Sequence, residues 1–288
     1  MNTFKYVLIS AGLLALPLSA FAQQYFSTPD QAAQALVKAV GNHDDAALQQ
    51  LLGDDWQVYL PEKDVDPDAV SRFLRDWKVS HNLVLQGDVA HLNVGAENWQ
   101  LPIPMVKTAD GWSFDMQKGA AEIETRAIGR NELSAIQAVT AYTDAQQQYW
   151  QTAGDPPHYA QKLISSEGQH DGLYWPVKEG EAPSPLGPAF GNDQPGSDYH
   201  GYYYKILTQQ GKNADGGALS YIDNGQMTKG FALIAWPASY GHTGITSFMI
   251  NQKGVVYQKD MGDDTDAQAR KIDSFDPDDS WQAIDEQP

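Results

Sequence analysis

Four carboxylates lie among aromatic residues in one Gly- and Pro-rich stretch, and their types and spacing are the best placed to do chemistry. They are Glu167, Asp171, Glu179 and Glu181. Two carboxylates facing each other across a groove, roughly 5–10 Å apart, can hydrolyse a glycosidic bond. One hypothesis is therefore a cofactor-free hydrolase acting on envelope polysaccharide, with acids such as Glu167 and Glu179 as the pair.

The same stretch also has the composition of a binding surface that cleaves nothing. Tyr174 and Trp175 interrupt the polar residues, and such rings offer a large apolar area with a polar group at the edge. With the acids facing solvent, the rings would anchor the loop or bind a partner. We favour this interpretation, so we expect no catalytic residue and a non-enzymatic interaction module.

A run of three tyrosines forms a second candidate surface. In a strand, Tyr202 and Tyr204 point to one face and Tyr203 to the other. One face belongs to the core, and the other is either core as well or a docking strip, to which tyrosine is well suited. His200 directly precedes the run. The candidate binding residues are thus Tyr174, Trp175, His200 and Tyr203.

Other catalytic and metal-binding patterns are missing from the sequence. Ser239 and His242 lie three positions apart but without the Gly-x-Ser-x-Gly pentad of a nucleophile elbow. The seven histidines are scattered, with no His-Glu-x-x-His zinc motif. The acidic runs at 64–68 and 273–279 do not fit the twelve-residue calcium loop. We expect neither a metal nor a cofactor.

The elements that must position these residues begin with short helices and a meander of strands. Thr28-Pro29-Asp30-Gln31 is typical of a helix start, with Thr as the N-cap and Pro at the first helical position. Further on, apolar residues alternate with polar ones at period two. The sequence predicts helices at 28–41, 44–52 and 67–77, and strands within 81–94, 99–106 and 111–116.

A central amphipathic helix follows, from 120 to 150, where apolar residues recur at spacings near three and four. Gly129 is expected to break it, with Asn131 capping a new start. After the Gly- and Pro-rich stretch at 153–199, an all-β part is predicted. Its strands are 202–209, 218–223, 227–236, 245–250 and 255–259, with a hairpin at Asn224-Gly225.

These elements predict an α+β protein. Residues 23–120 form a small domain of helices and antiparallel sheet, and residues 121–262 form the central helix with a second antiparallel sheet. Residues 263–288 carry nine acids against two basic residues, Arg270 and Lys271. This composition is typical of a solvated, disordered tail.

The composition limits the partners. The formal net charge is −18, and such a surface repels nucleic acid and anionic membranes, so we expect neither as a partner. The chain has no cysteine, which removes thiol nucleophiles and thiolate metal sites. No segment after the N-terminus is long and apolar enough to span a membrane. An envelope protein or a glycan remains as the partner.

The N-terminus reads as a cleavable secretory signal. Lys5 supplies the positive charge, an apolar run continues to Leu18, and Ala20-Phe21-Ala22 is a small-x-small cleavage site. The apolar run is shorter than the ~20 residues that cross a bilayer. We expect residues 1–22 to be removed near Ala22 and the mature chain to be periplasmic or extracellular.

Four longer motifs carry a resemblance to a known family. They are GRNE at 129–132, GYYYKIL at 201–207, GFALIAWPASYG at 230–241 and FMINQKGVVYQKD at 248–260. Together they resemble the Domain of Unknown Function 2950 (DUF2950) family of secreted bacterial proteins, over roughly residues 28–262. The resemblance implies an exported protein and implies no activity.

The C-terminal half is also similar to the soluble headgroup of type IV pilins and pseudopilins. The similarity rests on NELSAI at 131–136, the helix it opens, the Pro- and Gly-rich loop, and FALIAWP at 231–237. Pilins carry an apolar N-terminal helix behind a prepilin cleavage site, whereas here the helix is internal and amphipathic. The similarity therefore implies a pilin-headgroup-like sheet and not a filament subunit.

Overall fold

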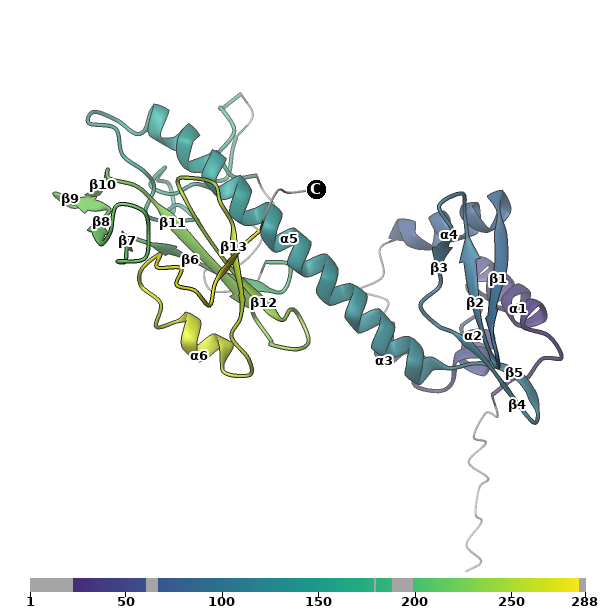
Figure 1. Cartoon of the computed structure of the whole chain (residues 1–288). Coiled ribbons are helices and arrows are strands. Elements are labelled where there is room, and N and C mark those ends of the chain that lie inside the picture. Colours follow the sequence, from purple (N-terminus) through teal and green to yellow (C-terminus); the bar gives the residue numbers. More distant parts are fainter. Residues whose placement is uncertain (1–22, 61–66, 179, 188–198, 285–288) are drawn as a thin grey trace, which may run out of the picture. The chain divides into compact units, whose positions relative to one another are not determined.

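Helices and antiparallel sheets make up the computed structural model, which describes residues 23–60, 67–178, 180–187 and 199–284 (Figure 1). This composition confirms the α+β class. The chain divides into two units after residue 123, where the sequence placed the boundary after residue 120. Each unit has its own buried apolar cluster. The predicted signal peptide, residues 1–22, lies outside the described residues.

Four helices open the N-terminal unit: α1 (Pro29–Asn42), α2 (Asp45–Leu52), α3 (Trp56–Tyr59) and α4 (Pro67–Val79). The predicted cap of α1 is present, because the Gln31 N–H donates to Thr28 Oγ1 at 3.3 Å. The helix passes Gly41 and ends at Asn42, where the C-cap residue His43, with a φ of 51°, reverses the chain. α3, which has no buried residue, was not predicted.

A five-stranded sheet completes this unit. Its strands are β1 (His81–Gln86), β2 (Val89–Val94), β3 (Trp99–Gln100), β4 (Met105–Thr108) and β5 (Gly111–Phe114). The order is β1-β2-β4-β5, with β3 also paired to β2. Ala90, Leu92 and Val94 of β2 face the core beneath the helices. The predicted hairpins at Gly87 and Gly111 are both confirmed.

One unbroken helix, α5 (Met116–Thr152), follows the sheet. The expected break at Gly129 is therefore wrong. Glycine costs a helix only about 1 kcal/mol, and downstream of Gly129 a buried face that includes Val139, Tyr142 and Tyr149 packs on the C-terminal core. Asn131 caps nothing and instead donates from Nδ2 to the Thr243 carbonyl at 2.9 Å.

The C-terminal unit is built on a sheet of order β14-β13-β12-β11-β6. These strands are β6 (Tyr202–Leu207), β11 (Ala232–Pro237), β12 (Thr246–Asn251), β13 (Tyr257–Asp260) and β14 (Gln282–Ala283). Every residue of the central strand β11 is buried. The unit also contains two small two-stranded ribbons. One pairs β7 (Gln209–Gln210) with β8 (Leu219–Ser220), and the other pairs β9 (Ile222–Asp223) with β10 (Gln226–Met227).

The predicted pairing of 218–223 with 227–236 is only partly correct. A short hairpin forms about Asn224-Gly225, where Ile222 pairs with Met227. β11 instead pairs with β6 on one side and β12 on the other. A strand that is buried throughout needs a neighbour at each edge, since an unpaired buried backbone group is costly.

The predicted disordered tail is wrong for residues 263–284. The segment contains α6 (Thr265–Ala269) and β14, and it carries two buried aromatic residues, Phe275 and Trp281. These side chains anchor the segment to the core while most of its acids stay at the surface. Acidic composition alone therefore did not decide its structure. Among the described helices, none has the length and apolarity to cross a membrane.

Two glycines of α5 give opposite expectations for alanine. A Cβ at Gly129 meets nothing within 4 Å, so Gly129→Ala should stabilise the chain by about 0.5–1 kcal/mol through helix propensity. A Cβ at Gly119 would lie 2.9 Å from Ile103 Cγ1, so Gly119→Ala should destabilise it. The urea concentration at the midpoint of unfolding, measured for each variant and for the wild-type chain, checks both expectations. A lower midpoint for Gly129→Ala would contradict the unbroken helix.

Candidate functional site

The stretch after α5 has little regular secondary structure, yet its backbone is tied into the C-terminal unit. The Tyr159 N–H donates to the Met227 carbonyl of β10 at 2.8 Å, and within the loop the Tyr174 N–H donates to the Leu163 carbonyl at 2.8 Å and the Leu186 N–H to the Leu173 carbonyl at 2.9 Å. Leu173 is completely buried in the core. The described part of this stretch, residues 153–187 without 179, is therefore a fixed loop that can hold a site.

Gln146 of α5 connects this loop to the helix. Its Nε2 donates to the Ala160 carbonyl at 2.8 Å, and its Oε1 accepts from the Ala160 N–H at 2.9 Å. Nε2 also donates to the Tyr142 hydroxyl at 3.0 Å, and that hydroxyl donates to the Ala232 carbonyl of β11 at 3.2 Å. The completely buried amide is thus fully paired, and it joins helix, loop and sheet.

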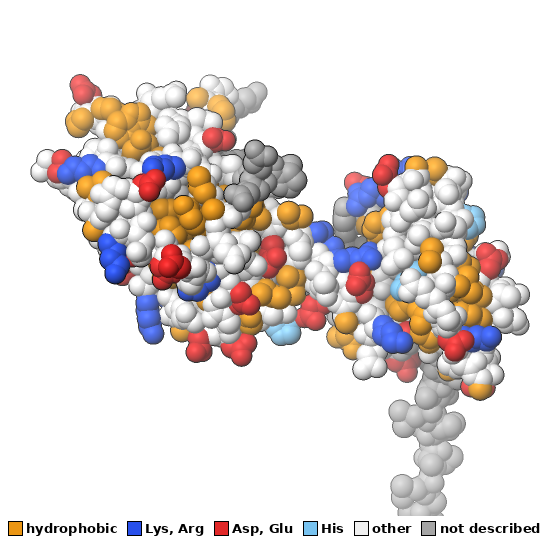
Figure 2. All heavy atoms as spheres, in the orientation of Figure 1, with side chains coloured by type: hydrophobic (Ala, Val, Ile, Leu, Met, Phe, Trp, Pro, Cys, Tyr) orange, Lys and Arg blue, Asp and Glu red, His pale blue; other side chains and the backbone are white. Residues whose placement is uncertain are grey.

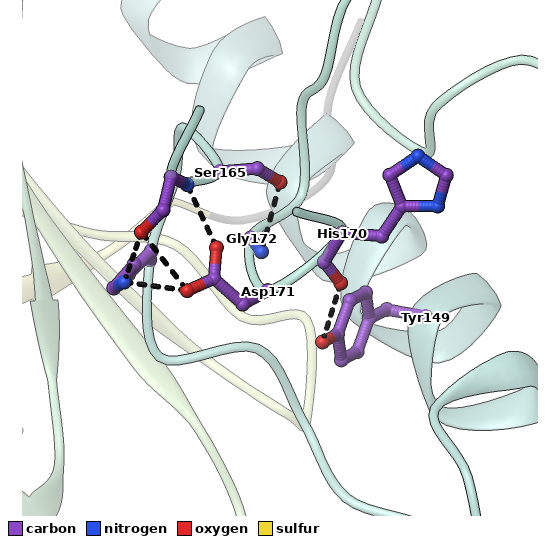
Figure 3. Close-up of polar contacts among 7 residues, drawn as sticks. Tyr149, Ser165, His170, Asp171 and Gly172 are labelled. Atoms are coloured by element: carbon purple, nitrogen blue, oxygen red, sulfur yellow. Dashed lines mark hydrogen bonds and ion pairs between the residues drawn. The ribbon is translucent and has the colours of Figure 1, made fainter. Parts of the chain in front are cut away.

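One turn further along α5, Tyr149 holds the segment that carries the aromatic residues. Its hydroxyl donates to the His170 carbonyl at 3.1 Å (Figure 3). The His170 ring stacks on Trp175, with 4.3 Å between ring centroids and 16° between planes. Burial raises the pKa of the Tyr149 phenol, and the nearby Asp171 charge raises it further. The phenol therefore stays protonated and keeps its donor role.

A pocket of about 500 Å³ opens between the last turns of α5 and this loop. This volume lies within the usual range for small-molecule sites. Rings, prolines and a few polar groups share the lining. The lining residues are Gln148, Tyr149, Thr152, Ala153, His170, Trp175, Glu181, Ala182, Pro183 and Pro185.

Asp171 fixes the turn beside the pocket. It accepts from Lys162 Nζ at 2.6 Å, from the Ser166 N–H at 2.7 Å and from Ser166 Oγ at 3.0 Å (Figure 3). The Lys162 hydrogen bond, followed by that of the Ser166 N–H, lowers the pKa of the Asp171 carboxyl to about 2. Asp171 is therefore ionised at neutral pH and cannot serve as an acid there.

The remaining predicted acids do not form the hydrolytic pair in the described residues. Glu167 is exposed and does not line the pocket, and Glu179 lies outside the described residues. Glu181 lines the pocket, and its Oε2 accepts from the Lys178 N–H at 3.1 Å. It is the single acid among the described lining residues.

Of the four predicted binding residues, the described lining of the pocket contains Trp175. Tyr174 and Trp175 are both half-buried and pack against the core, and of the two Trp175 lines the pocket. Tyr203 on β6 is also half-buried, with its ring 5.8 Å from Trp236. His200 is exposed beside Tyr199 and does not line the pocket.

Sequence reasoning missed the contribution of α5 to the pocket. Tyr149 appeared in the sequence as one of the apolar residues on the core face of the helix, and Thr152 follows at the helix end. No local pattern distinguishes a core position from a pocket wall. The sequence analysis used Pro183 and Pro185 only as part of a Pro-rich composition that predicts a loop, and gave them no role in a site.

No group of three or more His, Asp or Glu side chains is placed to hold a metal ion, as far as the described residues extend. In the acidic run at 273–279, Asp273 pairs with Lys205 Nζ at 2.8 Å and Asp276 accepts from the Asn213 N–H at 2.7 Å. Most of the other run, 64–68, lies outside the described residues.

Comparison with known proteins gives one match. The family described as "Protein of unknown function (DUF2950)" matches residues 23–284. No curated protein matches the chain, and no solved structure matches it. The similarity to pilin headgroups therefore stays a prediction.

The Asp171 turn should give a pH-dependent contribution to stability. Because the folded pKa is below the ordinary value of 3.8, the contribution is complete above about pH 5 and disappears as the pH falls toward 2. Asp171→Asn should therefore lower the urea midpoint at pH 7, and its difference from wild type should shrink between pH 5 and 3. Glu167→Gln, an exposed acid in the same loop, is the control. A difference independent of pH would contradict this role.

Proposed function

Since the chain belongs to the DUF2950 family, whose description supplies no activity, we propose a function from its pocket: an exported, non-enzymatic module that binds a glycan. The observation that carries the proposal is the lining, in which Trp175, Tyr149 and Glu181 surround a volume of about 500 Å³. This volume accommodates a few sugar units and is not the broad flat area of a protein interface.

The chemistry of the lining matches a sugar. The C–H face of a sugar ring packs on an aromatic ring, while its hydroxyls need hydrogen-bonding partners. Trp175 and Tyr149 provide the rings, and Gln148, Thr152 and Glu181 provide an amide, a hydroxyl and a carboxylate. The Tyr149–His170 hydrogen bond holds the lining before a ligand arrives, which reduces the entropy cost of binding.

Binding is favoured over hydrolysis by the positions of the acids. Glycoside hydrolysis needs one carboxyl group that can donate a proton and a second opposite it. Glu181 is alone among the described acids of the pocket, and Asp171, whose oxygens accept from Lys162 and Ser166, does not line it. We therefore place the polysaccharide hydrolase second.

The proposed site of action is outside the cytoplasm, in the periplasm or beyond. Support comes from the small-x-small motif Ala20-Phe21-Ala22 and from the family match, which begins at residue 23. The chain isolated from the cell envelope or medium should begin at Gln23 when its N-terminus is sequenced. A chain that remains in the cytoplasm and begins at Met1 would contradict export.

Glycan binding is tested by thermal melts of the wild-type chain against size-fractionated envelope oligosaccharides. A ligand at 100 times its Kd adds about 2.7 kcal/mol to the free energy of unfolding, which is a measurable shift of Tm. Trp175→Ala should abolish the shift without unfolding the chain, because the ring lines the pocket and is only half-buried at the edge of the core.

The matched control is Trp99→Ala, which removes a 48% exposed tryptophan in the N-terminal unit and should leave the shift unchanged. A wild-type chain that shows no shift with any oligosaccharide would contradict the glycan proposal. An equal loss in both variants would show that the shift does not come from the pocket.

A further inference from the structure

The first strand of the N-terminal sheet has an open edge. Within the part of the chain that the structure describes, β1 pairs with β2 and with no other strand (Figure 1). Such an edge presents unpaired N–H and C=O groups and is a template for another strand. Natural edges are blunted by charge, by proline or by a bulge. β1 has none of these, since its sequence is HNLVLQ and its register with β2 is continuous.

The edge is also apolar. Leu85 is 59% exposed and Val84 is 37% exposed, while Leu83 is half-buried. Figure 2 shows hydrophobic side chains reaching the surface of the N-terminal unit in the area where Figure 1 shows β1 and β2. Leu83 and Leu85 pair with Leu92 and Ala90 of β2, so they lie on the face of the sheet that carries the core.

We propose that this edge binds a second copy of the chain, with β1 antiparallel to the partner's β1 about a two-fold axis at Val84. The strand sequence is nearly symmetric about that residue, because leucine stands on each side and a carboxamide, Asn82 or Gln86, stands next on each side. A two-fold contact requires such a self-complementary surface. Leu83 would pack on the partner's Leu85, which covers the exposed side chain.

The backbone geometry suits this register. A two-residue turn with Gly87 at φ 62° joins β1 to β2, so Gln86 and Val89 form a hydrogen-bonded pair. Hydrogen-bonded and non-hydrogen-bonded residue pairs alternate along two antiparallel strands. Leu83 and Leu85 therefore stand in non-hydrogen-bonded pairs with β2 and direct their backbone N–H and C=O groups away from β2, toward the open edge. In the proposed register Leu83 stands opposite the partner's Leu85, so the free N–H and C=O groups of these two residues form hydrogen bonds with each other.

Charge complementarity favours the same arrangement. Two chains of net charge −18 repel each other in general, so self-association requires a contact without opposed acids. β1 carries no acidic residue. Beyond its ends, Asp88 of the hairpin turn would stand opposite the partner's Ser80, close to the partner's Lys78 in the last turn of α4, where the neighbouring acid, Asp76, is already paired with Arg75 at 2.8 Å. The two-fold axis repeats this contact, so Asp88 of each chain lies near Lys78 of the other.

Sedimentation of the full chain, as the cell processes it, tests the association. The wild-type mass should rise from one toward two chains with increasing protein concentration. Leu85→Lys should stay monomeric at the same concentrations, because it places a charge in the contact. Val255→Lys changes a residue that is 40% exposed in the other unit and should behave like wild type. A wild-type chain that is monomeric throughout would overturn the proposal.

The absence of cysteine from the sequence allows a sharper test of the register. In the proposed dimer, Val84 of one chain stands opposite Val84 of the other in a non-hydrogen-bonded pair. The two Cα atoms of such a pair lie roughly 4.5 Å apart, which is within disulfide range. Under oxidation, Val84→Cys should therefore form covalent dimers at least tenfold faster than Val255→Cys. Asn82→Cys should cross-link with Gln86→Cys in a mixture and much more slowly alone.

Equal cross-linking rates for Val84→Cys and Val255→Cys would overturn the proposed axis. Cross-linking of Asn82→Cys that is as fast alone as with Gln86→Cys would also overturn it. Circular dichroism of each variant verifies that the fold is intact, so loss of dimer cannot come from unfolding.

Discussion

The buried side chain of Gln146 is the interaction on which the candidate site depends. A primary amide removed from water has to satisfy its donors and its acceptor inside the protein, or the desolvation of each unpaired group costs about 1–3 kcal/mol. Gln146 uses both sides of its amide on the backbone of Ala160 and a further bond on the Tyr142 hydroxyl. The first residues of the loop are thereby fixed to the helix.

The pocket follows from the periodicity of α5. Tyr142, Gln146 and Tyr149 are separated by four and three residues, so they lie on one face of the helix. The first two connect that face to β11 and to the start of the loop, and Tyr149 holds the carbonyl of His170. Trp175, stacked on the His170 ring, then lines the pocket together with residues at the end of the helix. The position of the pocket is thus determined by core packing, although its lining residues come from a loop.

Local chemistry explains which features the sequence could predict. The cap of α1 and the hairpin at Gly87 depend on a few neighbouring residues and were predicted correctly. The unbroken helix at Gly129 and the folded segment around Phe275 depend on burial against distant residues, which composition does not reveal. Likewise Trp175 was recognised as a loop aromatic, but its place beside Tyr149 is a tertiary contact between residues without a shared sequence pattern.

Hydrogen exchange of backbone amides tests most directly the central claim that this loop is a fixed part of the fold. The amides of Ala160, Leu173 and Leu186 donate to Gln146 Oε1, to the Leu163 carbonyl and to the Leu173 carbonyl, respectively. Because opening any of them disrupts the core, they should exchange as slowly as the amides of the buried strand β11. Exchange at the rate of an unstructured peptide would contradict the account, since a loop that opens freely cannot hold the pocket.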